Sequence, residues 1–260
     1  MYTAGTTFDA SAHPVYSRLM EFKPGTTEAE AGLAESYEVN AEGTEYTFKL
    51  RSGVKFHTTE FFTPSREFNA DDVVFSLERQ LKADHPWNQY VAGTSWEYAA
   101  GMGFPELIKS IEKVDDMTVK FTLNKPEAPF LANLAMPFAS ILSKEYADKL
   151  EADGKKEQLN QMPIGTGPFK VADFKRNEAI KLVRNPDYWK KGRPYLDAIE
   201  FKIVPNRSTR VLGFVAGEYD LTFDSDITFP LLKDVKDQKK DAICEARPTN
   251  VHTNLLINRD

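Results

Sequence analysis

Short runs in which apolar and polar residues alternate predict a chain rich in β-hairpins. Residues 37–39 and 46–50 alternate on either side of a turn-forming segment that contains Asn40 and Gly43. Two alternating runs joined by such a turn are typical of a hairpin. The same pattern predicts two more hairpins, one from 107–114 and 117–123 and one from 167–174 and 178–183.

Apolar residues at helical spacing predict helices between these hairpins. Residues 10–21 carry Val15 and Leu19 at this spacing. Asn69, followed by two aspartates, is an N-cap signature for a helix over 70–82. Gly217 is placed to end a helix over 208–216 in the left-handed conformation. Further helices are expected over 128–135, 143–152 and 229–235.

From residue 196 onward the expected order changes to strand, helix, strand, which favours an open α/β sheet. The expected strands are 198–204, 219–223, 242–246 and 252–258. The meandering strands before this region predict an α+β subdomain over about 17–166, so the fold class is mixed α/β. No linker or internal repeat separates the parts, and we place the boundary near 166–168.

Composition narrows the function classes. The 260 residues are 41% hydrophobic and 12% aromatic, which is enough for a buried core. The net charge is -6 with both signs interspersed, which argues against nucleic acid as a partner. The longest uncharged run, 129–142, is shorter than the ~20 apolar residues of a membrane span. No secretory signal is visible in the first residues.

The residues that could carry chemistry form no catalytic or metal-binding pattern. Hydrolase, zinc-protease and nucleotide-loop motifs are absent, so no catalytic residue is predicted. The single Cys244 excludes an intrachain disulfide and is either a core residue or a reactive thiol. The histidines lack ligand spacing, so we predict no metal and no cofactor; they are His13, His57, His85 and His252.

Several residues that could have a functional role can also be explained by structure alone. The acidic residues Glu38, Glu42, Glu45, Asp71 and Asp72 lie at turns or a helix start, where they need no catalytic explanation. Three aromatic residues of one loop could stack on a ligand or pack the subdomain against its neighbour; they are Trp87, Tyr90 and Trp96. Gly165 and Gly167 predict tight backbone geometry where a strand enters a sheet.

A series of motifs in fixed order runs along nearly the whole chain. It includes Gly5-Thr-Thr-Phe-Asp9, Val15-Tyr-Ser-Arg-Leu19, Asn69-Ala-Asp-Asp72, Gly165-Thr-Gly-Pro-Phe169, Asn185-Pro-Asp-Tyr-Trp189 and Val204-Pro-Asn206. Together these motifs resemble extracellular solute-binding family 5, the peptide and nickel receptors of ABC importers, and its dipeptide receptors in particular.

The resemblance implies a lobe of the type II periplasmic-binding-protein fold with an inserted α+β subdomain. Residues 1–16 and 167–260 would belong to the ligand-binding lobe and 17–166 to the insertion, with a second lobe and a removed signal segment outside this chain. It also implies a periplasmic monomer that binds a small peptide and delivers it to the transmembrane subunits of an ABC permease. The implied protein is not an enzyme.

The ligand-contacting residues are expected where strands of the open sheet end. They are Phe223, Asp224 and Ser225, with Thr249, Asn250 and Asn254 nearby. The resemblance adds the segment from Thr3 to Gly5. Each could instead be an ordinary polar residue of a turn. Alternative functions are a receptor for haem, nickel or another solute, a sensory ectodomain, and a hydrolase with dispersed catalytic residues.

Overall fold

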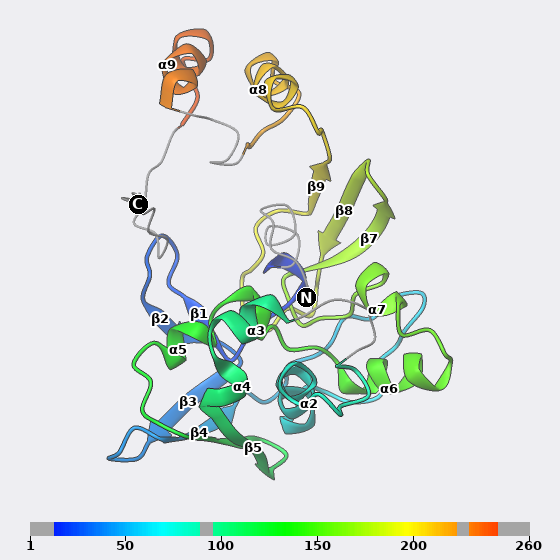
Figure 1. Cartoon of the computed structure of the whole chain (residues 1–260). Helices are drawn as coiled ribbons and strands as arrows, with labels where there is room; N and C mark the ends of the chain where they lie inside the picture. The colour runs from blue at the N-terminus through cyan, green and yellow to red at the C-terminus, as the bar shows by residue number, and fades with distance from the viewer. Residues whose placement is uncertain (1–12, 89–95, 223–228, 244–260) are drawn as a thin grey trace, which may run out of the picture.

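The strands form three antiparallel sheets in the computed structural model, which describes residues 13–88, 96–222 and 229–243 (Figure 1). Sheet A contains β1 (Met20–Phe22) and β2 (Ala29–Ala31). Sheet B has the order β3-β4-β6-β5 and sheet C the order β7-β8-β9. Their strands are β3 (Ala34–Val39), β4 (Glu45–Leu50), β5 (Ile108–Asp115), β6 (Thr118–Leu123), β7 (Phe169–Lys175), β8 (Ala179–Arg184) and β9 (Ala198–Lys202).

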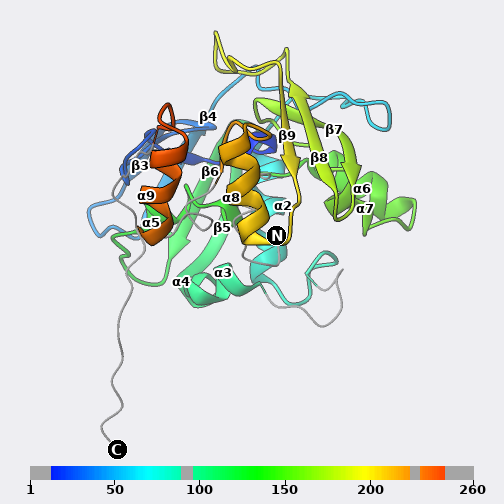
Figure 2. The ribbon, with the colours of Figure 1, turned by 90° about the horizontal axis from the view of Figure 1, so that it is seen from above.

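Helices cover sheet B and follow sheet C. The described helices are α2 (Ala70–Leu81), α3 (Glu97–Gly101), α4 (Phe104–Leu107), α5 (Phe130–Asn133), η1 (Pro137–Ala139), α6 (Lys144–Ala152), α7 (Gln158–Gln161), α8 (Arg207–Ala216) and α9 (Phe229–Gln238). α2 packs against β5 and β6. α8 and α9 lie side by side beyond the end of β9, away from sheet B (Figures 1 and 2).

The three hairpins predicted from alternation are confirmed. β3 pairs with β4, β5 with β6 and β7 with β8, all antiparallel. Local turn chemistry explains the first: the Asn40 side-chain oxygen accepts hydrogen bonds from the backbone N–H groups of Thr44 (2.8 Å) and Glu45 (2.9 Å). An asparagine that bonds to its own turn fixes the strand register without help from distant residues.

The predicted N-cap of α2 is also confirmed. The Asn69 side chain accepts from the Asp71 N–H, and the Asp72 carboxylate accepts from the Asn69 N–H in a capping box. Asp72 is fully buried and binds Arg66 through two hydrogen bonds of 2.7 and 2.8 Å. These contacts satisfy the free N–H groups of the first turn and so begin the helix at Ala70.

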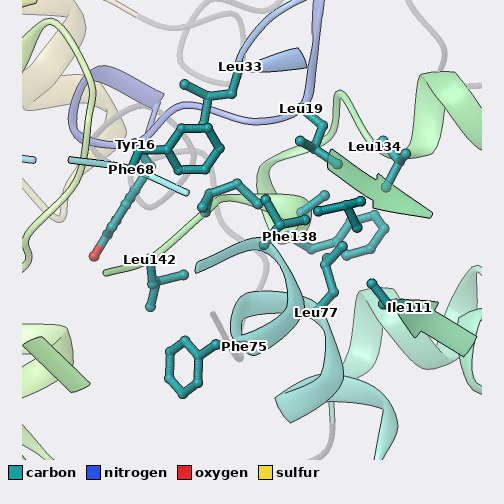
Figure 3. Packing of buried hydrophobic residues seen from close by; sticks show 14 of the residues in the cluster. Tyr16, Leu19, Leu33, Phe68, Phe75, Leu77, Ile111, Leu134, Phe138 and Leu142 are labelled. Carbon is teal, nitrogen blue, oxygen red and sulfur yellow. The ribbon is translucent and has the colours of Figure 1, made fainter. Parts of the chain in front are cut away.

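The core is one apolar cluster that lies mainly between sheet B and its helices and extends to Met20 of β1, Phe169 of β7 and Leu182 of β8; Figure 3 shows part of it. An aromatic series crosses it: Phe48 meets Phe121 at 5.4 Å between ring centroids, and Phe121 meets Phe130 at 5.7 Å. Phe104 and Phe138 extend the series with edge contacts at 5.1 Å. Aromatic residues bury large areas and therefore supply much of the stabilisation of this part of the chain.

Two predicted elements are wrong. The expected helix over 10–21 does not continue past Val15, because Met20–Phe22 pair with Ala29–Ala31 as β1 and β2. The expected strand 219–223 is absent over 219–222, and Leu221 is 69% exposed. A strand needs a partner for its backbone groups, and no described strand lies beside this segment. Residues 242–243 are not in a strand either.

Candidate functional site

Two segments far apart in the sequence cross in direct backbone contact at the entrance to sheet C. The Gly167 N–H donates to the Val15 carbonyl oxygen at 2.9 Å. A Cβ atom on Gly165 would lie 2.1 Å from the Val15 oxygen, and one on Gly167 would lie 2.4 Å from the Pro14 oxygen. Only glycine fits such an approach, so the tight geometry predicted for this pair is confirmed.

His57 holds the crossing from a third segment. Its backbone N–H donates to the Gly165 oxygen at 2.8 Å, and its ring Nε2 lies 2.9 Å from the Gly167 oxygen. The Gly165 N–H points at the ring Nδ1 at 3.4 Å. A carbonyl at Nε2 and an N–H at Nδ1 fit the neutral ring with its proton on Nε2. Burial lowers the pKa of His57 to about 4, in agreement with a neutral ring.

The turn after β8 closes the crossing from the other side. The Asn185 side-chain amide donates to the Gly167 oxygen at 3.0 Å, and its backbone N–H donates to the Pro168 oxygen at 2.8 Å. The Trp189 indole N–H donates to Ser17 Oγ at 3.2 Å, and that hydroxyl donates to the Thr166 oxygen at 3.2 Å. We call this assembly of residues 13–19, 57, 164–169 and 185–190 the junction.

Two cations lie over the Trp189 ring of the junction. The Arg51 guanidinium lies 4.9 Å and the Lys190 ammonium 5.1 Å from the Trp189 ring centroid. Lys190 also pairs with Glu21 at 2.5 Å, and Arg18 is buried on the crossing segment. Cations above an indole face gain from its electron-rich ring.

Sheet C connects the junction to the region where ligand contacts were predicted. Phe169 begins β7, and β9 leads to Asn206, whose side chain caps α8 by accepting from the Thr209 N–H at 3.0 Å. Gly217 ends α8 in the left-handed conformation with φ of 81°, as predicted. A Cβ on Gly213 would lie 2.4 Å from the Tyr219 ring, so that ring packs directly on the helix backbone.

The predicted ligand residues all lie outside the described residues. They are Thr3, Gly5, Phe223, Asp224, Ser225, Thr249, Asn250 and Asn254. The same holds for Tyr90, Cys244 and His252. Their roles remain predictions, although the wrong strand at 219–222 removes the argument that Asp224 follows a buried strand.

The other candidates have structural roles. Trp87 and Trp96 are 1% and 7% exposed and belong to the core cluster, which favours packing over ligand stacking. Asp71 pairs with Lys113, and Asp72 caps α2. Within the described ranges, no three His, Cys, Asp or Glu side chains gather as a metal site. No helix among those residues is long and apolar enough to cross a membrane.

Comparison with known proteins decides the family. The family model for bacterial extracellular solute-binding proteins, family 5, matches residues 28–260. The chain belongs to this family. Its fold is accordingly the mixed α/β fold of type II periplasmic binding proteins, as the sequence predicted. Proteins of this family are solute-binding proteins.

Individual family-5 relatives carry different names. The chain is 51% identical to heme-binding protein A of Haemophilus influenzae over 91% of its length and 53% identical to the dipeptide-binding protein of Escherichia coli over 81%. A periplasmic binding protein of Helicobacter pylori, solved with a bound peptide, matches 83% of the chain with 48% identity and a TM-score of 0.77. The chain spans 42%, 39% and 42% of the lengths of these three proteins.

Sequence reasoning did not find the roles of His57 and Arg18 in the junction. The short Gly-Thr-Gly sequence indicated a close backbone approach, but nothing local identified the segment that approaches. In the sequence His57 is one of four histidines without ligand spacing, and its carbonyl partner lies 110 residues away, so no local pattern indicates its role.

Proposed function

We propose that the chain is part of the substrate-binding component of an ABC importer that captures short peptides, dipeptides foremost. In this proposal the protein works in the periplasm as a monomer and delivers its ligand to the transmembrane subunits of the permease. It performs no catalysis. The observation that carries the proposal is the 53% identity to a dipeptide-binding protein over 210 residues.

The proposed architecture keeps the division predicted from the sequence. Residues 1–16 and 167–260 contribute to a ligand-binding lobe, and 17–166 form an inserted subdomain. In this division the His57 ring of the subdomain contacts the Gly167 carbonyl oxygen of the lobe at 2.9 Å, a hydrogen bond that would hold the two parts together. Closure of two lobes would remove water from the ligand and strengthen hydrogen bonds to its charged ends.

Asp224 provides a test of the proposed ligand contacts. A carboxylate at the cleft would accept from a peptide N–H or pair with its ammonium end, so Asp224→Ala should weaken dipeptide binding by about 1–3 kcal/mol. Isothermal titration calorimetry on the protein encoded by the complete gene measures this effect, with thermal unfolding as the control for stability. A lower melting temperature with unchanged affinity would make Asp224 a structural turn residue instead. The same two measurements on Thr249→Ala test the second predicted group of ligand contacts, Thr249, Asn250 and Asn254.

Haem is the second candidate ligand, because heme-binding protein A is 51% identical over 91% of the chain. Haem is large, planar and apolar apart from its two carboxylates, so it would need a wider pocket than a dipeptide. Titration of the complete protein with haem, followed by the absorbance of the bound porphyrin, distinguishes the two. Saturable haem binding without calorimetric binding of dipeptides would replace the peptide proposal.

A further inference from the structure

The Arg18 side chain is buried, and two of its three nitrogen atoms have no hydrogen-bond partner. It is 7% exposed, and its Nε and Nη1 atoms form no hydrogen bond. An arginine remains charged in proteins, and a buried charge without a partner strongly destabilises the folded state. Native structures rarely retain such a group unless a further group satisfies it.

The neighbouring charges leave this requirement unmet. Glu21 is the only carboxylate that acts on Arg18 among the described residues, and its carboxylate oxygen already lies 2.5 Å from Lys190 Nζ. The Tyr188 side chain also interacts electrostatically with Arg18 and favours its charged form. Arg193 also interacts electrostatically with Tyr188, so it adds positive charge near Arg18 and no negative charge.

A second buried group without a partner lies on the segment that meets Ser17, the residue before Arg18. Thr166 is fully buried, its backbone oxygen accepts from Ser17, and its own Oγ1 has no hydrogen-bond partner. A hydroxyl and a guanidinium both donate hydrogen bonds to carboxylate oxygens.

We propose that the Arg18 guanidinium is a binding position for a carboxylate group at the junction. A carboxylate is small and planar, and it matches the N–H groups of an arginine better than a spherical anion does. The carboxylate comes either from a small molecule or from an acidic side chain. The proposal does not depend on the peptide function, since it rests on burial and on missing partners alone.

The first experiment tests a small-molecule carboxylate. Thermal unfolding of the chain is followed while acetate replaces chloride at constant ionic strength. A ligand that binds only the folded state raises its stability in proportion to the logarithm of one plus the ligand concentration over its Kd. We expect a saturable rise in Tm for the wild type that Arg18→Met abolishes and that the control Arg193→Met retains.

The second experiment tests whether an acidic side chain pairs with Arg18. The answer depends on whether Arg18→Met lowers or raises the stability of the protein. If a carboxylate of the protein pairs with Arg18, Arg18→Met leaves that carboxylate buried without a partner and increases the unfolding equilibrium constant about tenfold or more. Arg18→Lys keeps a positive charge and should lose less stability than Arg18→Met. If Arg18 is unpaired, Arg18→Met removes a buried charge and leaves the protein equally or more stable. Urea unfolding of the three proteins measures this.

The proposal is supported by a rise in Tm that is specific to acetate and absent in Arg18→Met. It is also supported if Arg18→Met lowers the stability and Arg18→Lys restores part of it. The proposal is overturned by equal responses to acetate and chloride with no loss in Arg18→Met. It is also overturned if the methionine and lysine variants lose the same stability without any acetate response, because packing alone would then explain the arginine.

Discussion

At the residue scale, His57 makes the stability of the junction depend on pH. Its pKa is about 4 in the folded chain against 6.5 for a free histidine. The unfolded chain therefore binds more protons between these two values, so the stabilisation is complete above pH 6.5 and is lost as the pH falls to about 4. The difference between the two pKa values corresponds to roughly 3 kcal/mol.

Urea unfolding at several pH values between about 7 and 4 measures this loss. His57→Gln cannot take up the proton, so its profile should be flatter than that of the wild type. His13 is solvent-exposed, so solvent screens its charge and His13→Gln should change the profile less. Parallel profiles for wild type and His57→Gln would contradict a neutral His57 ring in the folded chain.

The glycine at the crossing gives a second prediction at this scale. In Gly165→Ala the new methyl group would meet the Val15 carbonyl oxygen at 2.1 Å, and a backbone atom held by hydrogen bonds cannot move aside easily. We expect a loss of about 3 kcal/mol in the free energy of unfolding. Gly101→Ala is the matched control, because no atom lies within 4 Å of the position that its methyl group would take and α3 gains a better helix former. Equal stability of the two variants would refute the steric argument.

At the element scale, Asp72 connects α2 to α6. Its carboxylate binds Arg66 and accepts from the backbone N–H of Asn69 (3.0 Å) and of Lys144 (2.8 Å). Asp72→Ala leaves these donors without an acceptor and should cost about 3 kcal/mol. Asp71→Ala is the control on the same turn: Asp71 is 42% exposed in its pair with Lys113, and its loss should cost less than about 1 kcal/mol. Chemical denaturation compares them, and similar losses would show that Asp72 acts only through the helix dipole.

The elements also show which parts of the fold can be predicted from local sequence patterns. The hairpin at Asn40 and the start of α2 at Asn69 were predictable because their hydrogen bonds join residues a few positions apart. Met20 and Glu21, at the end of the helix predicted over 10–21, belong to a strand because pairing with Glu30 and Ala31, not their own spacing, sets their conformation. The burial of Arg18 could not be predicted, since it depends on segments that meet only in the folded chain.

At the scale of the whole molecule, the receptor proposal predicts compaction. A ligand enclosed between two lobes closes them, so the protein encoded by the complete gene should show a smaller radius of gyration in X-ray scattering when dipeptide is added. Under the same proposal the 260-residue chain, which spans 39% of the length of the dipeptide-binding protein, would provide only part of the enclosure that buries a small ligand and should bind the dipeptide weakly. Tight binding by this chain, or no compaction with any peptide or with haem, would argue against enclosure between lobes.

The crossing at the junction also affects how the protein is made. Ser17 and Thr166 meet across 149 residues, and closing a loop of that length costs about 4 kcal/mol of chain entropy. A ribosome adds about 5–20 residues per second, so Ser17 waits roughly 7–30 s before Thr166 is synthesised. During that time Val15 and Leu19, which are 2% and 1% exposed in the folded chain, lack the partners that the junction provides. We expect a chaperone that recognises apolar segments to contact the nascent chain there.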